Sequence, residues 1–186
     1  MILEAHSAAP TLKYSAMLEM RAGNAAWSRL LLPSHPAREA FMHDICKDTN
    51  MVYLTRRTSF SASHRLWSEH LKEEENYAIY EKCANPNGHG HNYILEVTVR
   101  GTPDPQTGMV LNLTELKQAT REQVVKWVDH KHLNYDVPWL EGCIPTTEVL
   151  AMKFWERLEP VLPSGLLYEV KLYETDNNSA SYRGES

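Results

Sequence analysis

The sequence predicts an α+β fold, a four-stranded antiparallel sheet with two helices packed on one of its faces. Three observations predict this class. Apolar and polar residues alternate in four stretches, apolar residues recur at helical spacing in two stretches, and the order along the chain is strand, strand, helix, helix, strand, strand. A single sheet of this kind leaves its edge strands unpaired, so those edges need a partner.

The N-terminal stretch differs in composition from the rest of the chain. Residues 1–50 scatter Ala, Ser, Pro and His without a sustained strand or helix period. Arginines among small residues are typical of a transit peptide, but acidic residues recur here and argue against one. We expect residues 1–50 to form a disordered N-terminal extension and residues 51–186 to form one folded domain.

The first two strands are predicted by alternation. Met51 to His64 carries apolar residues at Val52, Leu54 and Phe60, and a second strand runs to Gly101. In the second strand Tyr93, Leu95, Val97 and Val99 share one face. The polar stretch 65–82 between the strands contains three consecutive glutamates and is predicted to be a surface helix.

Two core helices and a second pair of strands follow. Asn112 is predicted to cap the first helix, and the second begins near Thr146 or Thr147 and ends at Pro160. Their predicted core residues are Leu113, Leu116, Val124, Trp127 and Val128 in the first helix, and Leu150, Phe154, Trp155 and Leu158 in the second. Strands are then expected over Leu166–Thr175 and Ala180–Arg183, with Glu174 at the end of an apolar face.

Three histidines predict a metal site. His89 and His91 are two residues apart and point to one face of a strand, and His64 shares the face of Phe60 at the end of the earlier strand. If those strands pair, three imidazoles meet and leave a fourth position open, as in a catalytic zinc site. Cys83 could instead fill that position and close a structural site.

Composition excludes several classes of function. The 186 residues have a formal net charge of −5, so nothing indicates the basic footprint of a nucleic-acid-binding protein. The sequence has no apolar run long enough to span a bilayer. Three cysteines are few and odd in number, which favours free thiols and a cytoplasmic location.

Several motifs resemble one enzyme family, the 6-pyruvoyl-tetrahydropterin synthases of animal type. The likeness spans Thr55 to Glu185 and is carried by Ser59 to Leu66, Cys83 to Tyr93, Asp104 to Val110, Asp129 to Lys131, Thr146 to Glu148 and Tyr173 to Asn178. The resemblance implies the tunnelling fold, in which subunits join edge strands into a barrel. It also implies a homohexamer of two stacked trimers with active sites between subunits.

The resemblance implies roles for nine residues. Matched to the family's motifs, they are the zinc ligands His64, His89 and His91, the catalytic residues Cys83, Asp129 and His130, the pterin anchor Glu174, and Thr146 and Thr147 near the pterin. The implied reaction is zinc-dependent conversion of 7,8-dihydroneopterin triphosphate to 6-pyruvoyl-tetrahydropterin, with triphosphate elimination, in tetrahydrobiopterin biosynthesis. The alternatives are a 6-carboxy-tetrahydropterin synthase acting on the same substrate and a non-catalytic zinc- or pterin-binding module.

Overall fold

A mixed sheet of five strands organises the part of the chain that the computed structural model describes, residues 51–185. In the order β3-β1-β2-β4-β5, the strands are β1 (Val52–His64), β2 (His89–Gly101), β3 (Lys131–His132), β4 (Leu167–Tyr173) and β5 (Ser179–Tyr182). β1, β2, β4 and β5 are the four predicted strands and pair antiparallel. The α+β class is confirmed, and the extension predicted over residues 1–50 lies outside the described residues.

The predicted strand count was wrong because of β3, which pairs in parallel with the end of β1. Two residues are too few to show a period in the sequence. Backbone hydrogen bonds on either side of β3 hold it against β1. His130 N donates to Ser61 O (2.6 Å) and Leu133 N donates to Ser63 O (2.8 Å). The Asp129–His130 pair is thereby anchored beside the end of β1.

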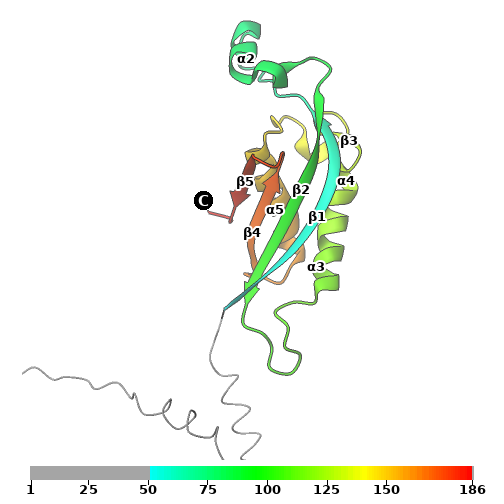
Figure 1. Cartoon of the computed structure of the whole chain (residues 1–186), viewed down its shortest axis with the longest axis vertical. Helices are drawn as coiled ribbons and strands as arrows, with labels where there is room; N and C mark the ends of the chain where they lie inside the picture. Colours follow the sequence, from blue (N-terminus) through cyan, green and yellow to red (C-terminus); the bar gives the residue numbers. More distant parts are fainter. Residues whose placement is uncertain (1–50, 186) are drawn as a thin grey trace, which may run out of the picture. The chain divides into compact units, whose positions relative to one another are not determined.

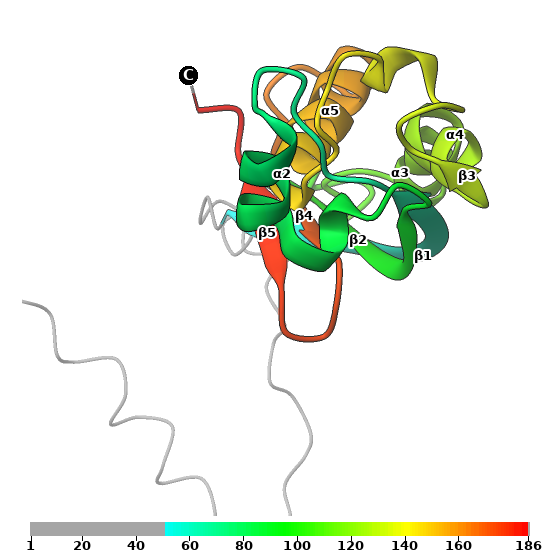
Figure 2. The same cartoon turned by 90° about the horizontal axis from the view of Figure 1, so that it is seen from above.

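The helices have two locations. Their bounds are α2 (Glu73–Tyr80), η2 (Glu81–Ala84), α3 (Leu113–Thr120), η3 (Arg121–Val125), α4 (Lys126–Val128), η4 (Pro138–Leu140), α5 (Thr147–Leu158) and η5 (Glu159–Val161). Figure 2 shows α3, α4 and α5 on the same side of the strands. In Figure 1, α2 stands apart, beyond the end of the sheet where β1 stops and β2 begins.

The predicted first core helix is one helical path with a π-helical segment, η3, between α3 and α4. Its predicted apolar stripe was correct at Leu116, Val124 and Val128, which are buried, and wrong at Leu113 and Trp127, which are 49% and 40% exposed. Thr120 is buried instead, and its hydroxyl donates to Leu116 O at 2.8 Å. A π-turn is wider than an α-turn, so residues after it no longer keep the helical phase that the sequence pattern assumes.

The core lies between the sheet and the helices on one face. The side chains of Tyr93, Leu95, Val97 and Val99 are completely buried, as their alternation predicted. They belong to the same cluster as the buried residues of α5, which begins after its N-cap Thr146. In residues 51–185 no helix combines the length and the apolarity needed to cross a membrane.

Candidate functional site

Three imidazoles converge at the end of the core face. His64 and His89 are directly opposite each other in the β1–β2 register, and His91 follows on the same face of β2. One ring nitrogen of each lies within 4.8 Å of the others, and His64 Nε2 is 3.1 Å from His89 Nε2. Two nitrogens bound to one tetrahedral zinc ion are about 3.4 Å apart, so the spacing fits a shared ion. The predicted convergence is confirmed.

The hydrogen bonds of these rings favour metal binding. His64 is completely buried, and its Nδ1–H donates to Pro145 O at 2.8 Å, which leaves Nε2 free to be a ligand. His91 Nε2 is buried without a hydrogen-bond partner among the described residues. An unpartnered buried nitrogen is costly, and a metal ion would satisfy it. The three side chains therefore fit a divalent metal such as zinc.

Close strand contact at this site requires glycine. Gly88, just before β2, has φ +68°, and a Cβ there would lie 2.8 Å from His64 O and 3.0 Å from His132 Nε2. A larger residue would push the start of β2 away from β1. Gly88 thus permits the close approach of the two strands beside His89.

The metal-free protein should be acid-sensitive. Burial, and next the neighbouring imidazoles, lower the pKa of His64 from 6.5 to about 4. Between these values the unfolded chain binds a proton that the folded chain does not, so the free energy of unfolding decreases as the pH is lowered, by about 2 kcal/mol between pH 7 and pH 5 and by about 3 kcal/mol below pH 4. Burial also lowers the pKa of His89 and His132, which adds to the loss. Urea denaturation in the presence of a chelator, at about pH 7 and at about pH 5, measures this difference in the free energy of unfolding. Equal free energies at the two pH values would contradict the prediction.

Glu174 lies beside the histidines. Its Oε1 is 3.5 Å from His64 Nε2 and 3.7 Å from His91 Nε2. With Thr146 and Thr147 it lines a cavity of about 470 Å³, so the three predicted substrate-binding residues are brought together. Glu148 lines the same cavity and was missed, although it directly follows the two threonines in the sequence.

Cys83 lies near the cluster and outside it. The thiol is in η2 and lines a cavity of about 700 Å³ together with His89. Among the described residues, the group of ligand atoms within 4.8 Å contains the three histidines and no sulfur, so the closed Cys-His site is not formed. Burial, followed by the Glu174 and Glu81 carboxylates, raises the pKa of the Cys83 thiol. A thiolate at Cys83 would therefore require a compensating positive charge nearby.

The residues that follow His64 hold the Cys83 segment in place. Leu66 N donates to Cys83 O at 2.9 Å, and Arg65 Nε donates to Ala84 O at 2.9 Å. Asn134 clamps Arg65 in turn, accepting from its backbone N–H and donating to its carbonyl. Arg65 thus links the end of β1 to the backbone beside the thiol.

Replacing Arg65 with Gln should therefore lower kcat about tenfold and leave KM and metal content unchanged, because a charge-assisted hydrogen bond is lost. Arg65→Lys, which keeps the charge, should restore part of the rate. Steady-state kinetics and metal analysis of both variants check this. A lower metal content in Arg65→Gln would show that the residue supports the histidines rather than the thiol.

Asp129 and His130 form a pair on the other side of the histidines. Asp129 Oδ1 accepts from Ser61 N at 2.9 Å and lies 3.0 Å from His130 Nδ1. These hydrogen bonds, that of the Ser61 amide above all, lower the pKa of Asp129. His130 has φ +58°, an uncommon conformation for a non-glycine residue, and its side chain is 81% exposed.

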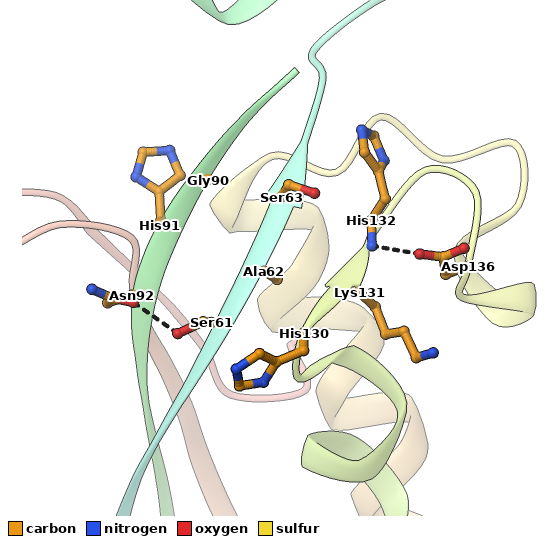
Figure 3. A pocket seen from close by; sticks show the side chains of 10 residues that line it. All are labelled: Ser61, Ala62, Ser63, Gly90, His91, Asn92, His130, Lys131, His132 and Asp136. Atoms are coloured by element: carbon orange, nitrogen blue, oxygen red, sulfur yellow. Dashed lines mark hydrogen bonds between the residues drawn. The ribbon is translucent and has the colours of Figure 1, made fainter. Parts of the chain in front are cut away.

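His130 and Cys83 line different cavities. Figure 3 shows the His130 cavity, of about 570 Å³, which His91 also lines. The Cys83 cavity is shared with His89, so the histidine cluster stands between the two. Within one chain the structure does not bring the three predicted catalytic residues together.

The sequence did not mark His132 as a candidate site residue. It lines the His130 cavity, and its backbone N–H donates to Asp136 Oδ2 at 2.8 Å (Figure 3). Its ring centroid lies 4.4 Å from that of Tyr135. Its Nδ1 is buried without a hydrogen-bond partner among residues 51–185. Only β3 brings this side chain near the metal centre, and the sequence did not reveal β3.

Comparisons with known proteins agree with this geometry. The sequence profile of the family described as 6-pyruvoyl tetrahydropterin synthase matches residues 53–185. The human 6-pyruvoyl tetrahydrobiopterin synthase is 54% identical over 132 residues, which cover 71% of this chain and 91% of that protein. The Drosophila melanogaster enzyme of the same name is 51% identical over 136 residues, 72% of this chain and 80% of that protein.

A solved structure agrees as well. The 6-pyruvoyl tetrahydropterin synthase of Caenorhabditis elegans superposes with a TM-score of 0.70 at 40% identity, covering 74% of this chain and 98% of that one. The family profile covers nearly all of the described residues, and the relatives are matched over most of their length. The chain belongs to the 6-pyruvoyl tetrahydropterin synthase family of enzymes.

Proposed function

We propose that the chain is a zinc-dependent cytoplasmic enzyme that converts 7,8-dihydroneopterin triphosphate to 6-pyruvoyl-tetrahydropterin and eliminates triphosphate. The observation that carries the proposal is the three-histidine cluster, with the Cys83 cavity on one side and the His130 cavity on the other. Family membership supports the substrate. The described cysteines Cys83 and Cys143 are free thiols, as expected in a reducing compartment.

The reaction must remove carbon-bound protons next to hydroxyl groups. A zinc ion held by the three histidines would coordinate a side-chain hydroxyl oxygen and acidify the neighbouring protons as a Lewis acid. The protein supplies the bases. Cys83 takes and returns a proton as thiolate and thiol, and His130 exchanges protons at Nε2 while Asp129 Oδ1 accepts from its Nδ1–H.

We propose that two subunits complete this set within a homohexamer of two stacked trimers. Two observations support it. Cys83 and His130 of one chain line different cavities. Within the described chain the outer edge of β1 is paired only at Ala62 and Ser63, so the rest of that edge is available for a strand of another subunit.

Glu174 is proposed to anchor the pterin, because a carboxylate can accept two parallel hydrogen bonds from the ring's N–H and amino groups. Thr146 and Thr147 border the same cavity. Glu174→Gln should raise KM about tenfold or more with zinc content unchanged, since the amide replaces an acceptor with a donor. Asp176→Asn, an exposed neighbour in the following turn, is the matched control and should leave KM unaltered. Loss of zinc in Glu174→Gln would instead make this carboxylate a metal ligand.

The whole proposal is tested by one experiment. Purified protein is analysed for zinc and incubated with 7,8-dihydroneopterin triphosphate without added nicotinamide, while triphosphate release and the pterin product are followed. We expect stoichiometric zinc and a pyruvoyl side chain on the product. A carboxylate product with loss of acetaldehyde would identify a 6-carboxy-tetrahydropterin synthase, and zinc without turnover would identify a binding module.

A further inference from the structure

A smaller cavity, lined by three cationic side chains, lies between β1 and the α3–η3 segment, away from the histidines. It has a volume of about 150 Å³, equal to about five water molecules, and so has room for one small oxyanion. Its lining is basic and hydroxylic and consists of Arg56, Thr58, Lys117, Thr120, Arg121 and Val125. None of the residues proposed to act in catalysis lines this cavity.

The three cations of this cavity have no counter-ion within residues 51–185. Among the described residues, Arg56, Lys117 and Arg121 form no ion pair, whereas their neighbours Arg57 and Lys126 pair with Glu96 and Glu122. Arg56 Nε is buried and lacks a hydrogen-bond partner in residues 51–185. A buried donor left unpaired destabilises a protein, so a ligand that bonds to Arg56 Nε would be stabilising.

The backbone at this cavity is also unusual. Arg121 and Val125 are the ends of η3, the π-helical segment that interrupts the helix. Such segments occur frequently at functional sites, because they re-aim side chains that a regular helix would place elsewhere. Here the segment begins with a cationic residue of the cavity, directly after the buried Thr120.

The cavity is well separated from the metal centre. Arg56 and His64 are eight residues apart on β1, which corresponds to about 26 Å along a strand. A substrate bound to the histidines of the same chain cannot extend its phosphates over that distance. A ligand at Arg56 therefore binds independently of the proposed reaction in that chain.

We propose that this basic cavity is a binding site for a phosphate-type oxyanion, which bridges Arg56 of β1 to Lys117 and Arg121. Guanidinium groups bind phosphate oxygens in a fork of parallel hydrogen bonds, and the Lys117 ammonium adds charge. The Thr58 hydroxyl is a further donor. A bound oxyanion would satisfy Arg56 Nε and tie the helical segment to the strand.

The test is isothermal titration calorimetry of the full chain with inorganic phosphate at low ionic strength. Wild type should bind with a Kd at or below about 1 mM. Arg56→Gln and Arg121→Gln should each weaken binding about tenfold or more, because each loses a charge-assisted hydrogen bond. Lys126→Gln is the matched control, since it removes one positive charge from the next helical turn but lies outside the cavity, and it should bind like wild type.

A local readout separates this cavity from any phosphate bound near the histidines. Phosphate should slow backbone hydrogen exchange in residues 117–125 of wild type and of Lys126→Gln, and not in Arg121→Gln. Arg121 is exposed, so this variant remains informative even if Arg56→Gln fails to fold. Absence of binding by wild type, or equal affinity in Arg121→Gln and Lys126→Gln, would overturn the proposal. Neither measurement depends on turnover, so failure here would leave the proposed reaction untouched.

Discussion

Replacing Cys83 with Ala should reduce kcat about 100-fold to 10,000-fold and leave the zinc content at one ion per chain. The first effect is expected because general acid–base groups contribute rate factors of about that size. The second follows from the geometry, since the three histidine nitrogens form the ligand group without the sulfur. Steady-state kinetics and metal analysis of the same preparation measure both.

The chain offers a matched control for this variant. Cys143 is the other described free cysteine, it is half-buried like Cys83, and it borders neither the Cys83 cavity nor the His130 cavity. Cys143→Ala should keep both zinc and turnover. If Cys83→Ala lost its zinc together with its activity, the thiol would be a ligand and the closed structural site would be the correct description.

The convergence of the three histidines could be predicted because their pattern is local and simple. Alternation places His89 and His91 on one face, and only one further condition, antiparallel pairing with the strand that ends at His64, was needed to bring in the third imidazole. The same alternation predicted the buried face of β2 correctly. The glycine at position 88 has a simple physical explanation, because the close approach of His64 O leaves no room for a side chain there.

Other parts of the site depend on contacts that no short pattern contains. Asn134 and Arg65 are hydrogen bonded to each other although they are 69 residues apart in the sequence, and nothing local marks either residue as a partner of the other. β3 exists because its neighbours bond to Ser61 and Ser63, so tertiary contacts rather than propensity create it. His132 became a candidate only through that strand.

The π-helical segment shows a third kind of limit. Leu113, Leu116, Val124, Trp127 and Val128 were assigned to one stripe on the assumption of a constant helical period. η3 changes the period after Thr120, and Trp127, which follows η3, is exposed although Val124 and Val128 are buried as predicted. Leu113, the first residue of α3, lies before η3 and is exposed as well. The apolar pattern predicted that a helix exists, but it could not predict a change of phase within that helix.

His91→Ala should cause the second large effect, the loss of the metal itself. Removing a ligand should weaken zinc binding by more than about 100-fold, since loss of an outer hydrogen-bond partner of a ligand already costs about 10-fold to 100-fold. His91 is the best choice for this test. Its Nε2 has no hydrogen-bond partner among the described residues, whereas His64 is buried in the core and hydrogen bonded to Pro145 O. Substitution of His64 would therefore confound metal loss with a packing defect.

The control for His91→Ala is His70→Ala, which removes an exposed imidazole outside the cluster. Zinc content after dialysis against a weak chelator should be near zero in His91→Ala and unchanged in His70→Ala, and turnover should follow the metal. Millimolar zinc should restore part of the activity of His91→Ala if the two remaining imidazoles still hold an ion. Full zinc content and full turnover in His91→Ala would contradict the assignment of the cluster as the catalytic metal site, because a three-ligand site cannot lose a ligand without losing affinity.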